Sequence, residues 1–297
     1  MKLAVCNCLV CSVKSRPVRV RGDVLLLLLL VWPHQGHTQT SATPTDSNAA
    51  ASWFGAMRGD FAHALQAPTR WSRRDGPKIA TLALTVGGLV RWADEDIDRE
   101  FPQDEHRLFS PARGLLPLGE KYDTIPSTHM IVGLTAAFSL SSVVLDEPRH
   151  LETARLLVEA YVIVNGVGIV GKQLLGRARP FVGSGSRDFD LARFSSQNDF
   201  RSMPSGHSLE AFATMTILAK RYPHWWVQLP AYSVAGGVAA QRIDTHKHWV
   251  SDVVLGGTIG YQVARMLADH SAARSSDPSA AVRLVYHPAG IGLAVTF

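Results

Sequence analysis

Between residues 77 and 272 the sequence is a succession of apolar stretches separated by short breaks that contain charged residues or proline. Most of the uncharged runs are roughly a dozen residues long, which favours buried core helices over membrane spans of about 20 residues. Helices are expected at residues 79–90, 124–145, 151–179, 209–221, 230–241 and 250–269. The sequence therefore predicts an all-α fold, a helical bundle that covers residues 77–272.

Two uncharged runs are longer than the others. Residues 124–145 and 222–241 could each cross a bilayer, although Pro223 and Pro230 weaken the second. The adjacent Trp225 and Trp226 fit either a membrane interface or a cap on the core. The mean hydropathy of +0.04 is low for an enzyme with several membrane spans. We therefore expect a bundle that is soluble or only peripherally attached to a membrane surface.

The N-terminus differs in charge from the rest of the chain. Of the formal net charge of +5, residues 1–42 contribute +4, in a basic stretch that ends at Arg21. A leucine run and small polar residues up to Ala42 follow. This pattern predicts a signal peptide over residues 1–42, since the apolar run is too short for an uncleaved anchor. All three cysteines fall inside it, so the mature protein would have no disulfide.

The remaining segments flank the bundle. Residues 43–76 are expected to form a linker and an N-terminal segment, and residues 273–297 a tail. Alternation of apolar and small residues at 291–297 predicts a short β-hairpin that docks against the bundle. The nearly balanced charge outside the signal peptide does not suggest a nucleic-acid partner. A signal peptide of bacterial type indicates a periplasmic or otherwise exported protein, with attachment to the inner membrane left open.

Lys172 and Arg179 form the first of three segments that carry chemistry. They stand seven residues apart, so on one helix they share a face, and Pro180 would close that helix. An ammonium and a guanidinium on one face suit a tetrahedral oxyanion. The alternative is a solvated basic helix end, where cations are favoured in any case.

The second segment is Pro204-Ser205-Gly206-His207, which precedes an apolar run. It predicts a turn that opens a helix, with Ser205 as the cap and free backbone N–H groups facing an anion. Gly206 would let the backbone approach that anion closely. An ordinary helix cap with an incidental histidine is the alternative.

The third segment contains Arg242, His248 and Asp252. The histidine and the aspartate stand one helical turn apart, so the carboxylate can accept a proton from one imidazole nitrogen. That hydrogen bond would leave the other nitrogen free for nucleophilic attack. A structural His–Asp pair is the alternative. Arg242 adds a third cation near the same place.

An acidic cluster begins at Asp94 and continues with Asp96, Asp98 and Glu105. Its spacing weakly resembles a calcium loop, but Arg99 stands where such a loop requires glycine. We expect the cluster to form a solvated helix end, and His246 to be a loop histidine and not a ligand.

In order and spacing, the three segments resemble the signature of the type 2 phosphatidic acid phosphatase/vanadium haloperoxidase superfamily: K-x6-RP, PSGH and SR-x5-H-x3-D. The resemblance covers about residues 150–268, with every catalytic position filled. The departure is Gln241, where the family usually has serine, and we expect it to tune anion binding without abolishing it. The resemblance implies the helical bundle of that superfamily and a bacterial exported phosphatase.

The resemblance also implies a role for each residue of the segments. His248 would attack phosphorus and form a phosphohistidine, Asp252 would orient it, and His207 would protonate the leaving oxygen. The phosphate would be bound by Lys172, Arg179, Ser205, Gly206 and Arg242. No metal or other cofactor is needed in this scheme, because the cationic side chains neutralise the charge.

The expected function is metal-independent hydrolysis of phosphomonoesters or pyrophosphates. The substrate would be a phosphorylated small molecule or lipid; lipid phosphates, polyprenyl pyrophosphate and soluble phosphomonoesters all fit. One alternative is a vanadium-dependent haloperoxidase, in which vanadate takes the place of phosphate, although those enzymes are typically much longer. The other is a catalytically silent binding protein on the same fold, which the complete set of catalytic residues argues against.

Overall fold

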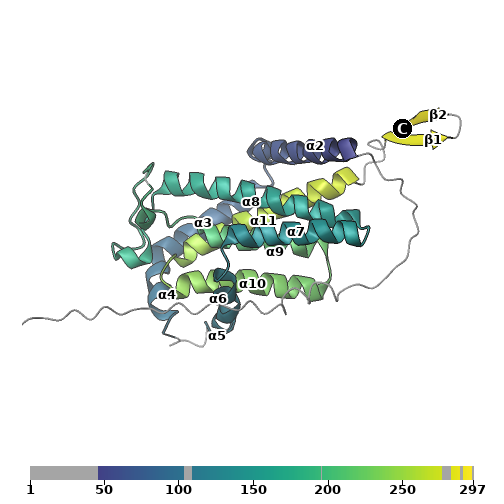
Figure 1. Cartoon of the computed structure of the whole chain (residues 1–297). Helices are drawn as coiled ribbons and strands as arrows, with labels where there is room; N and C mark the ends of the chain where they lie inside the picture. The colour runs from purple at the N-terminus through teal and green to yellow at the C-terminus, as the bar shows by residue number, and fades with distance from the viewer. Residues whose placement is uncertain (1–45, 104–108, 195, 276–281, 288–289, 296–297) are drawn as a thin grey trace, which may run out of the picture. The chain divides into compact units, whose positions relative to one another are not determined.

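The computed structural model describes residues 46–103, 109–194, 196–275, 282–287 and 290–295, and it confirms the predicted all-α fold (Figure 1). Its helices are α2 (Asp46–Leu65), α3 (Gly76–Trp92), α4 (Asp94–Glu100), α5 (Ser110–Arg113), α6 (Leu116–Asp123), α7 (Ser127–Val144), α8 (Pro148–Leu175), α9 (Gly206–Arg221), α10 (Trp225–Asp244) and α11 (Val250–Ser275). Three 3-10 turns join them: η1 (Ala67–Arg70), η2 (Pro180–Val182) and η3 (Asn198–Phe200). The predicted signal peptide lies outside the described residues.

Two short strands follow the helices, β1 (Val282–His287) and β2 (Gly290–Val295). They pair antiparallel, with Val282 opposite Val295 and His287 opposite Gly290. The docking of this tail against the helices stays a prediction.

Helix α9 packs against α8, α10 and α11, and these helices run alongside one another in Figure 1. The core between α8, α9 and α11 contains large apolar side chains that are at most 1% exposed: Leu156, Leu157, Leu209, Ile217 and Leu267. Burial of each such side chain stabilises the fold by about 1.5–3 kcal/mol relative to exposure. This core fixes the relative positions of three of the helices that carry predicted site residues.

Helices α9 and α11 approach each other closely at the beginning of α9. A Cβ atom added to Gly256 of α11 would lie 2.6 Å from the carbonyl oxygen of Ser205, so only glycine fits there. The N–H of Ser205 donates to the carbonyl oxygen of Asp252 at 3.1 Å. The second and third sequence segments are thereby joined through their backbones.

Helix α8 ends earlier than the sequence predicts. Its last residue is Leu175, and Gly176 follows in the left-handed conformation (φ 52°), donating its N–H to the carbonyl oxygen of Lys172 at 3.1 Å. Glycine at this position is a common helix stop. The prediction that a single helix reaches residue 179 is therefore wrong.

Helix α2 begins at Asp46, within residues 43–76, which are expected to form a linker and an N-terminal segment. Farther along this helix, the fully buried carboxylate of Asp60 ties α2 to two other helices. It pairs with Arg155 of α8 and accepts hydrogen bonds from Arg274 of α11 at 2.9 and 3.0 Å. A charge network between distant segments leaves no local pattern in the sequence.

Candidate active site

Lys172 lies in the last turn of α8 and reaches the beginning of α9. A Cβ atom added to Gly206 would lie 3.0 Å from its Nζ atom, so the ammonium sits directly beside the first residue of α9. The first N–H groups of a helix have no partner within the helix and attract anions. An ammonium and a helix N-terminus therefore meet at one point.

Arg179 reaches the same region from beyond the end of α8. Its backbone is extended (φ −80°, ψ 157°), so the prediction that it shares a helix face with Lys172 is wrong. Its Nε and Nη2 atoms donate to the carbonyl and side-chain oxygens of Asn198 at 3.0 and 2.9 Å. Its Nη1 atom donates to the carbonyl oxygen of Lys247 at 3.3 Å. The turn after Gly176, and not helical periodicity, brings the two cations together.

Ser205 stands at the N-cap position of α9, as predicted, but its hydroxyl does not cap the helix. It accepts a hydrogen bond from the hydroxyl of Ser208 at 3.1 Å, and both serines are fully buried. The backbone of Ser205, and not its hydroxyl, therefore holds the first turn of α9. Gly206 and His207 are the first two residues of this helix.

His248 is buried, with its side chain 2% exposed, just before α11. Its Nδ1 atom lies 3.7 Å from Oδ2 of Asp252, which is too long for a hydrogen bond. The carboxylate instead accepts from Arg177 at 2.6 Å, from the backbone N–H of Trp249 at 3.0 Å and from the hydroxyl of Ser202. The predicted partners are neighbours, but the predicted hydrogen bond is not formed.

Arg177 is a member of this site that the sequence reasoning missed. It is fully buried, and besides Asp252 it donates to Asp94 at 2.6 Å. Asp94, 1% exposed, also accepts from the hydroxyl of Ser251 at 2.6 Å. The expectation that Asp94 belongs to a solvated helix end is therefore wrong. Arg177 lies two residues before Arg179 and could have been suspected, whereas nothing in the sequence indicates its pairing with Asp94.

Arg242 closes the site from the last turn of α10. It is 3% exposed, and its Nε donates to Oε1 of Gln241 at 2.6 Å. Its Nη2 atom forms an ion pair with Oδ2 of Asp123 at 2.5 Å. The other oxygen of Asp123 lies 3.5 Å from Nε2 of His207, and Nζ of Lys247 is 3.8 Å from Oδ2. Asp123 lies far away in the sequence, in a short helix that was not predicted.

The electrostatic environment changes both histidines. Burial lowers the pKa of His248 to about 4, with Arg179 and Lys172 adding to the effect and Asp252 opposing it. Burial and the charge of Arg242 likewise lower the pKa of His207 to about 4. Both imidazoles are therefore neutral at neutral pH, which suits a nucleophile. A general acid here has to gain its proton when a negatively charged ligand binds.

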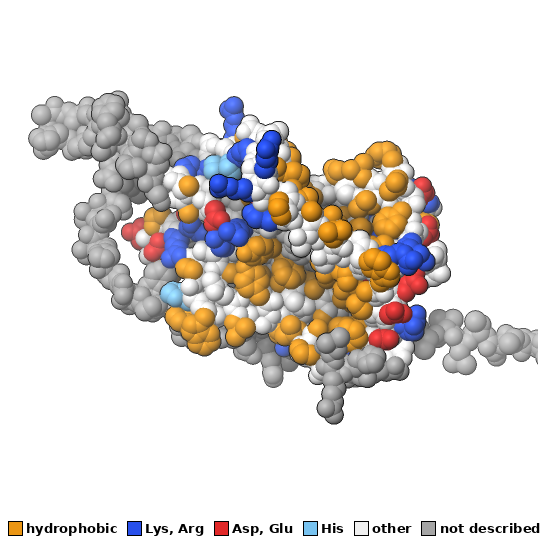
Figure 2. Space-filling model, turned by 180° about the vertical axis from the view of Figure 1, so that it is seen from behind, with side chains coloured by type: hydrophobic (Ala, Val, Ile, Leu, Met, Phe, Trp, Pro, Cys, Tyr) orange, Lys and Arg blue, Asp and Glu red, His pale blue; other side chains and the backbone are white. Residues whose placement is uncertain are grey.

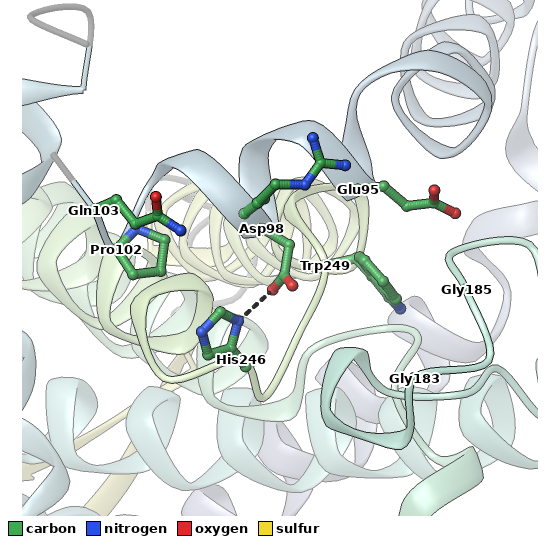
Figure 3. Close-up of a pocket in the computed structure, with 9 residues that line it drawn as sticks. Glu95, Asp98, Pro102, Gln103, Gly183, Gly185, His246 and Trp249 are labelled. Atoms are coloured by element: carbon green, nitrogen blue, oxygen red, sulfur yellow. Dashed lines mark hydrogen bonds and ion pairs between the residues drawn. The ribbon is translucent and has the colours of Figure 1, made fainter. Parts of the chain in front are cut away.

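A separate depression of about 470 Å³ opens beside the turn that precedes His248 (Figure 3). His246 in this turn has a positive φ of 52° and pairs with Asp98 at 3.0 Å, as the dashed line in Figure 3 marks. Glu95, Gln103 and Trp249 also line the depression. The wall contains two carboxylates, from Glu95 and Asp98, against one guanidinium, from Arg99, so this depression is poorly suited to phosphate.

The part of the chain that contains these segments is similar to known proteins. Residues 153–274, which contain all eight predicted site residues, match the family model of the PAP2 superfamily. This stretch of the chain is a PAP2 superfamily domain. The superfamily resemblance of the three sequence segments is thereby confirmed.

Two curated proteins that are similar to this chain carry the name lipid A 1-phosphatase. The protein from Porphyromonas gingivalis is 31% identical over 106 residues, which are 35% of this chain and 20% of the relative. The protein from Rhizobium johnstonii is 34% identical over 89 residues, which are 30% of this chain and 36% of the relative. The chain thus matches about a fifth and about a third of the length of these relatives. No solved structure gives a significant match.

Proposed function

We propose that this chain is a phosphatase that removes the phosphoryl group of a phosphorylated lipid through a phosphohistidine at His248. One observation carries the proposal: a buried, neutral imidazole at His248 feels the charges of Arg179 and Lys172, and Lys172 stands at the N-terminus of α9. Binding of a phosphoryl group and nucleophilic attack on it require these features at one place.

In the first step, the imidazole Nε2 of His248 attacks phosphorus, since Nδ1 faces Asp252. A P–N bond forms as the bond between phosphorus and the leaving oxygen breaks, and His207 gives its proton to that oxygen. In the second step, water attacks phosphorus and His207 takes a proton from it. The P–N bond then breaks, which releases orthophosphate and restores His248.

The cations stabilise the charge that the three non-reacting phosphoryl oxygens carry in the transition state. Lys172 and the N–H groups at Gly206 would bind these oxygens from the side of α8 and α9. Arg179 and Arg242 would bind them from the other segments. Arg177 has a different task. It neutralises Asp252 and Asp94 in the buried wall behind His248, which keeps the orienting carboxylate ionised and in position.

The names of the two relatives support a phosphorylated lipid as the substrate. The surface supports it as well, because α7 leaves Val132, Leu140 and Val143 exposed at 61%, 65% and 80%. By length and composition, α7 and α8 are the two helices in the described part that could cross a membrane. On the face that lies behind the view of Figure 1, Figure 2 also shows hydrophobic side chains gathered over the middle, with charged side chains toward the margins. We infer that the apolar helices contact the acyl region of a membrane and that catalysis takes place on its periplasmic side.

The test is turnover of a lipid-phosphate and pyrophosphate panel by purified protein. His248→Asn is expected to lower the rate by about 1,000-fold or more, since loss of a nucleophile removes the covalent route. His246→Asn is the matched control, because asparagine tolerates the positive φ and the side chain faces the other depression. Full activity of His248→Asn would overturn the proposal.

Two further measurements distinguish the proposed metal-free phosphatase from a metal-dependent enzyme and from a haloperoxidase. Turnover is expected to be unchanged by EDTA, because side chains supply the positive charge. Loss of turnover that added Mg²⁺ restores would contradict the metal-free scheme. Peroxide-dependent bromination with added vanadate, in place of phosphate release, would identify a haloperoxidase.

A further inference from the structure

The carboxylate of Asp123 faces the cationic side of the proposed phosphoryl site. It lies 2.5 Å from Arg242, 3.5 Å from His207 and 3.8 Å from Lys247, measured between charged or titratable atoms. Nε2 of Gln241 also donates to Oδ2 of Asp123 at 3.4 Å. One carboxylate thus lies close to the groups that a phosphoryl oxygen would approach.

Asp123 is held at this place by the packing of α6 on α10. A Cβ atom added to Gly237 of α10 would lie 2.5 Å from the carbonyl oxygen of Leu115 and 3.0 Å from the backbone nitrogen of Gly119. Tyr122, next to Asp123, is buried in the core between α6, α9 and α10. Because the backbone of α6 is fixed, the carboxylate stays near the site when a ligand arrives.

The carboxylate is ionised at neutral pH. Burial acts to raise the pKa of Asp123, but the hydrogen bond and charge of Arg242 outweigh it and hold the pKa below its ordinary value. Gln241 supports the arrangement, since it accepts from Nε of Arg242 and donates to Asp123. A serine at this position is too short to bridge both groups in the same way.

We propose that Asp123 is a built-in counter-anion, which competes with the phosphoryl group for Arg242 and so limits how tightly the site holds the orthophosphate product. This inference rests on the proposed function, because it assumes that the cationic site binds phosphoryl groups. A negative charge fixed beside the site repels a bound anion and competes with it for the guanidinium of Arg242. Weaker product binding allows faster release at each turnover.

The test compares the binding of orthophosphate and of vanadate to wild type and to Asp123→Asn, by calorimetry and by inhibition of turnover. Asparagine keeps the size of the side chain and removes its charge. We expect Asp123→Asn to bind both anions about tenfold more tightly, a change of ~1.4 kcal/mol. Asp123→Ser removes the charge with a different side chain and is expected to do the same.

Two control variants test whether the change in anion binding comes from the charge of Asp123. Asp123→Glu keeps the charge and is expected not to tighten binding. Asp269→Asn removes a half-exposed carboxylate that pairs with Lys220 at 2.7 Å on the surface, and it is expected to leave anion affinity unchanged. Circular dichroism and the melting temperature report whether each variant is folded.

The outcomes separate this inference from the proposed function. Weaker anion binding by Asp123→Asn would mean that Asp123 positions Arg242 for the ligand, and unchanged binding would mean that its charge has no effect. Either result overturns the proposal that Asp123 is a counter-anion and leaves the phosphatase proposal unaffected. Failure of wild type and of both charge-removing variants to bind either anion would overturn both.

Discussion

At the scale of single residues, His207 has the most testable task. Its proposed role is to protonate the leaving oxygen, and poor leaving groups depend on that proton far more than good ones. We expect His207→Asn to lower kcat by roughly 100-fold or more for an alkyl phosphate and much less for p-nitrophenyl phosphate. The measurement is kcat across a series of leaving groups. Equal losses along the series would rule out the general-acid role.

The lowered pKa values of His207 and His248 also predict how stability depends on pH. In the unfolded chain both histidines bind protons as the pH falls through about 6.5, while in the folded protein they resist protonation down to about 4. The unfolded state therefore binds more protons in this range, and stability is lost as the pH falls from about 6.5 towards 4. Denaturant titrations at several pH values measure this slope. His248→Asn should make it shallower, and an unchanged slope would contradict the burial argument.

The proposed catalytic residues could be predicted from the sequence because they lie in three short segments with characteristic spacing. The pairing of Arg177 with Asp94 could not be predicted, since this buried ion pair joins positions 83 residues apart. Asp123 is similar: a carboxylate becomes part of a cationic site only through the folding of α6 against α10. The distance of 3.7 Å between His248 and Asp252 likewise depends on where α11 begins, which spacing alone does not determine.

At the scale of helices, the contact between α9 and α11 aligns the second and third sequence segments of the site. Alanine at Gly256 would push its Cβ against the Ser205 carbonyl. We expect Gly256→Ala to lower the free energy of unfolding by about 1–3 kcal/mol and to reduce turnover. Gly133→Ala in α7, where an added Cβ meets open space, is the control and should be neutral or slightly stabilising. Equal behaviour of the two variants would show that the close approach is unimportant.

Apolar runs identified the long helices but located their ends poorly. Helices α7, α9, α10 and α11 fall where long uncharged runs predict them, because each buries or presents an apolar surface. The end of α8 was missed because a single glycine overrides the apolar pattern before Arg179. Helix α2 was missed because its attachment depends on the buried charge of Asp60, and α6 because it is only two turns long.

At the scale of the whole molecule, α7 and α8 carry exposed apolar side chains, and we propose that this surface contacts lipid. The sequence-based expectation was a soluble or peripherally attached bundle, and the proposal here is direct contact with lipid acyl chains. We expect the protein to float with phospholipid vesicles and to be released by detergent but not by 1 M salt. Release by salt alone would indicate a peripheral, electrostatic attachment, and a soluble monomer would contradict lipid contact altogether.

The central claim is that His248 forms a covalent bond to the phosphorus of the substrate. The most direct measurement is an alkaline quench during turnover of ³²P-labelled p-nitrophenyl phosphate, followed by mass spectrometry of the labelled peptide. Alkali preserves phosphohistidine, and a good leaving group makes breakdown of the intermediate the slower step. The account predicts acid-labile label on the peptide that contains His248 and none in His248→Asn. Turnover without such label, or label on another residue, would contradict it.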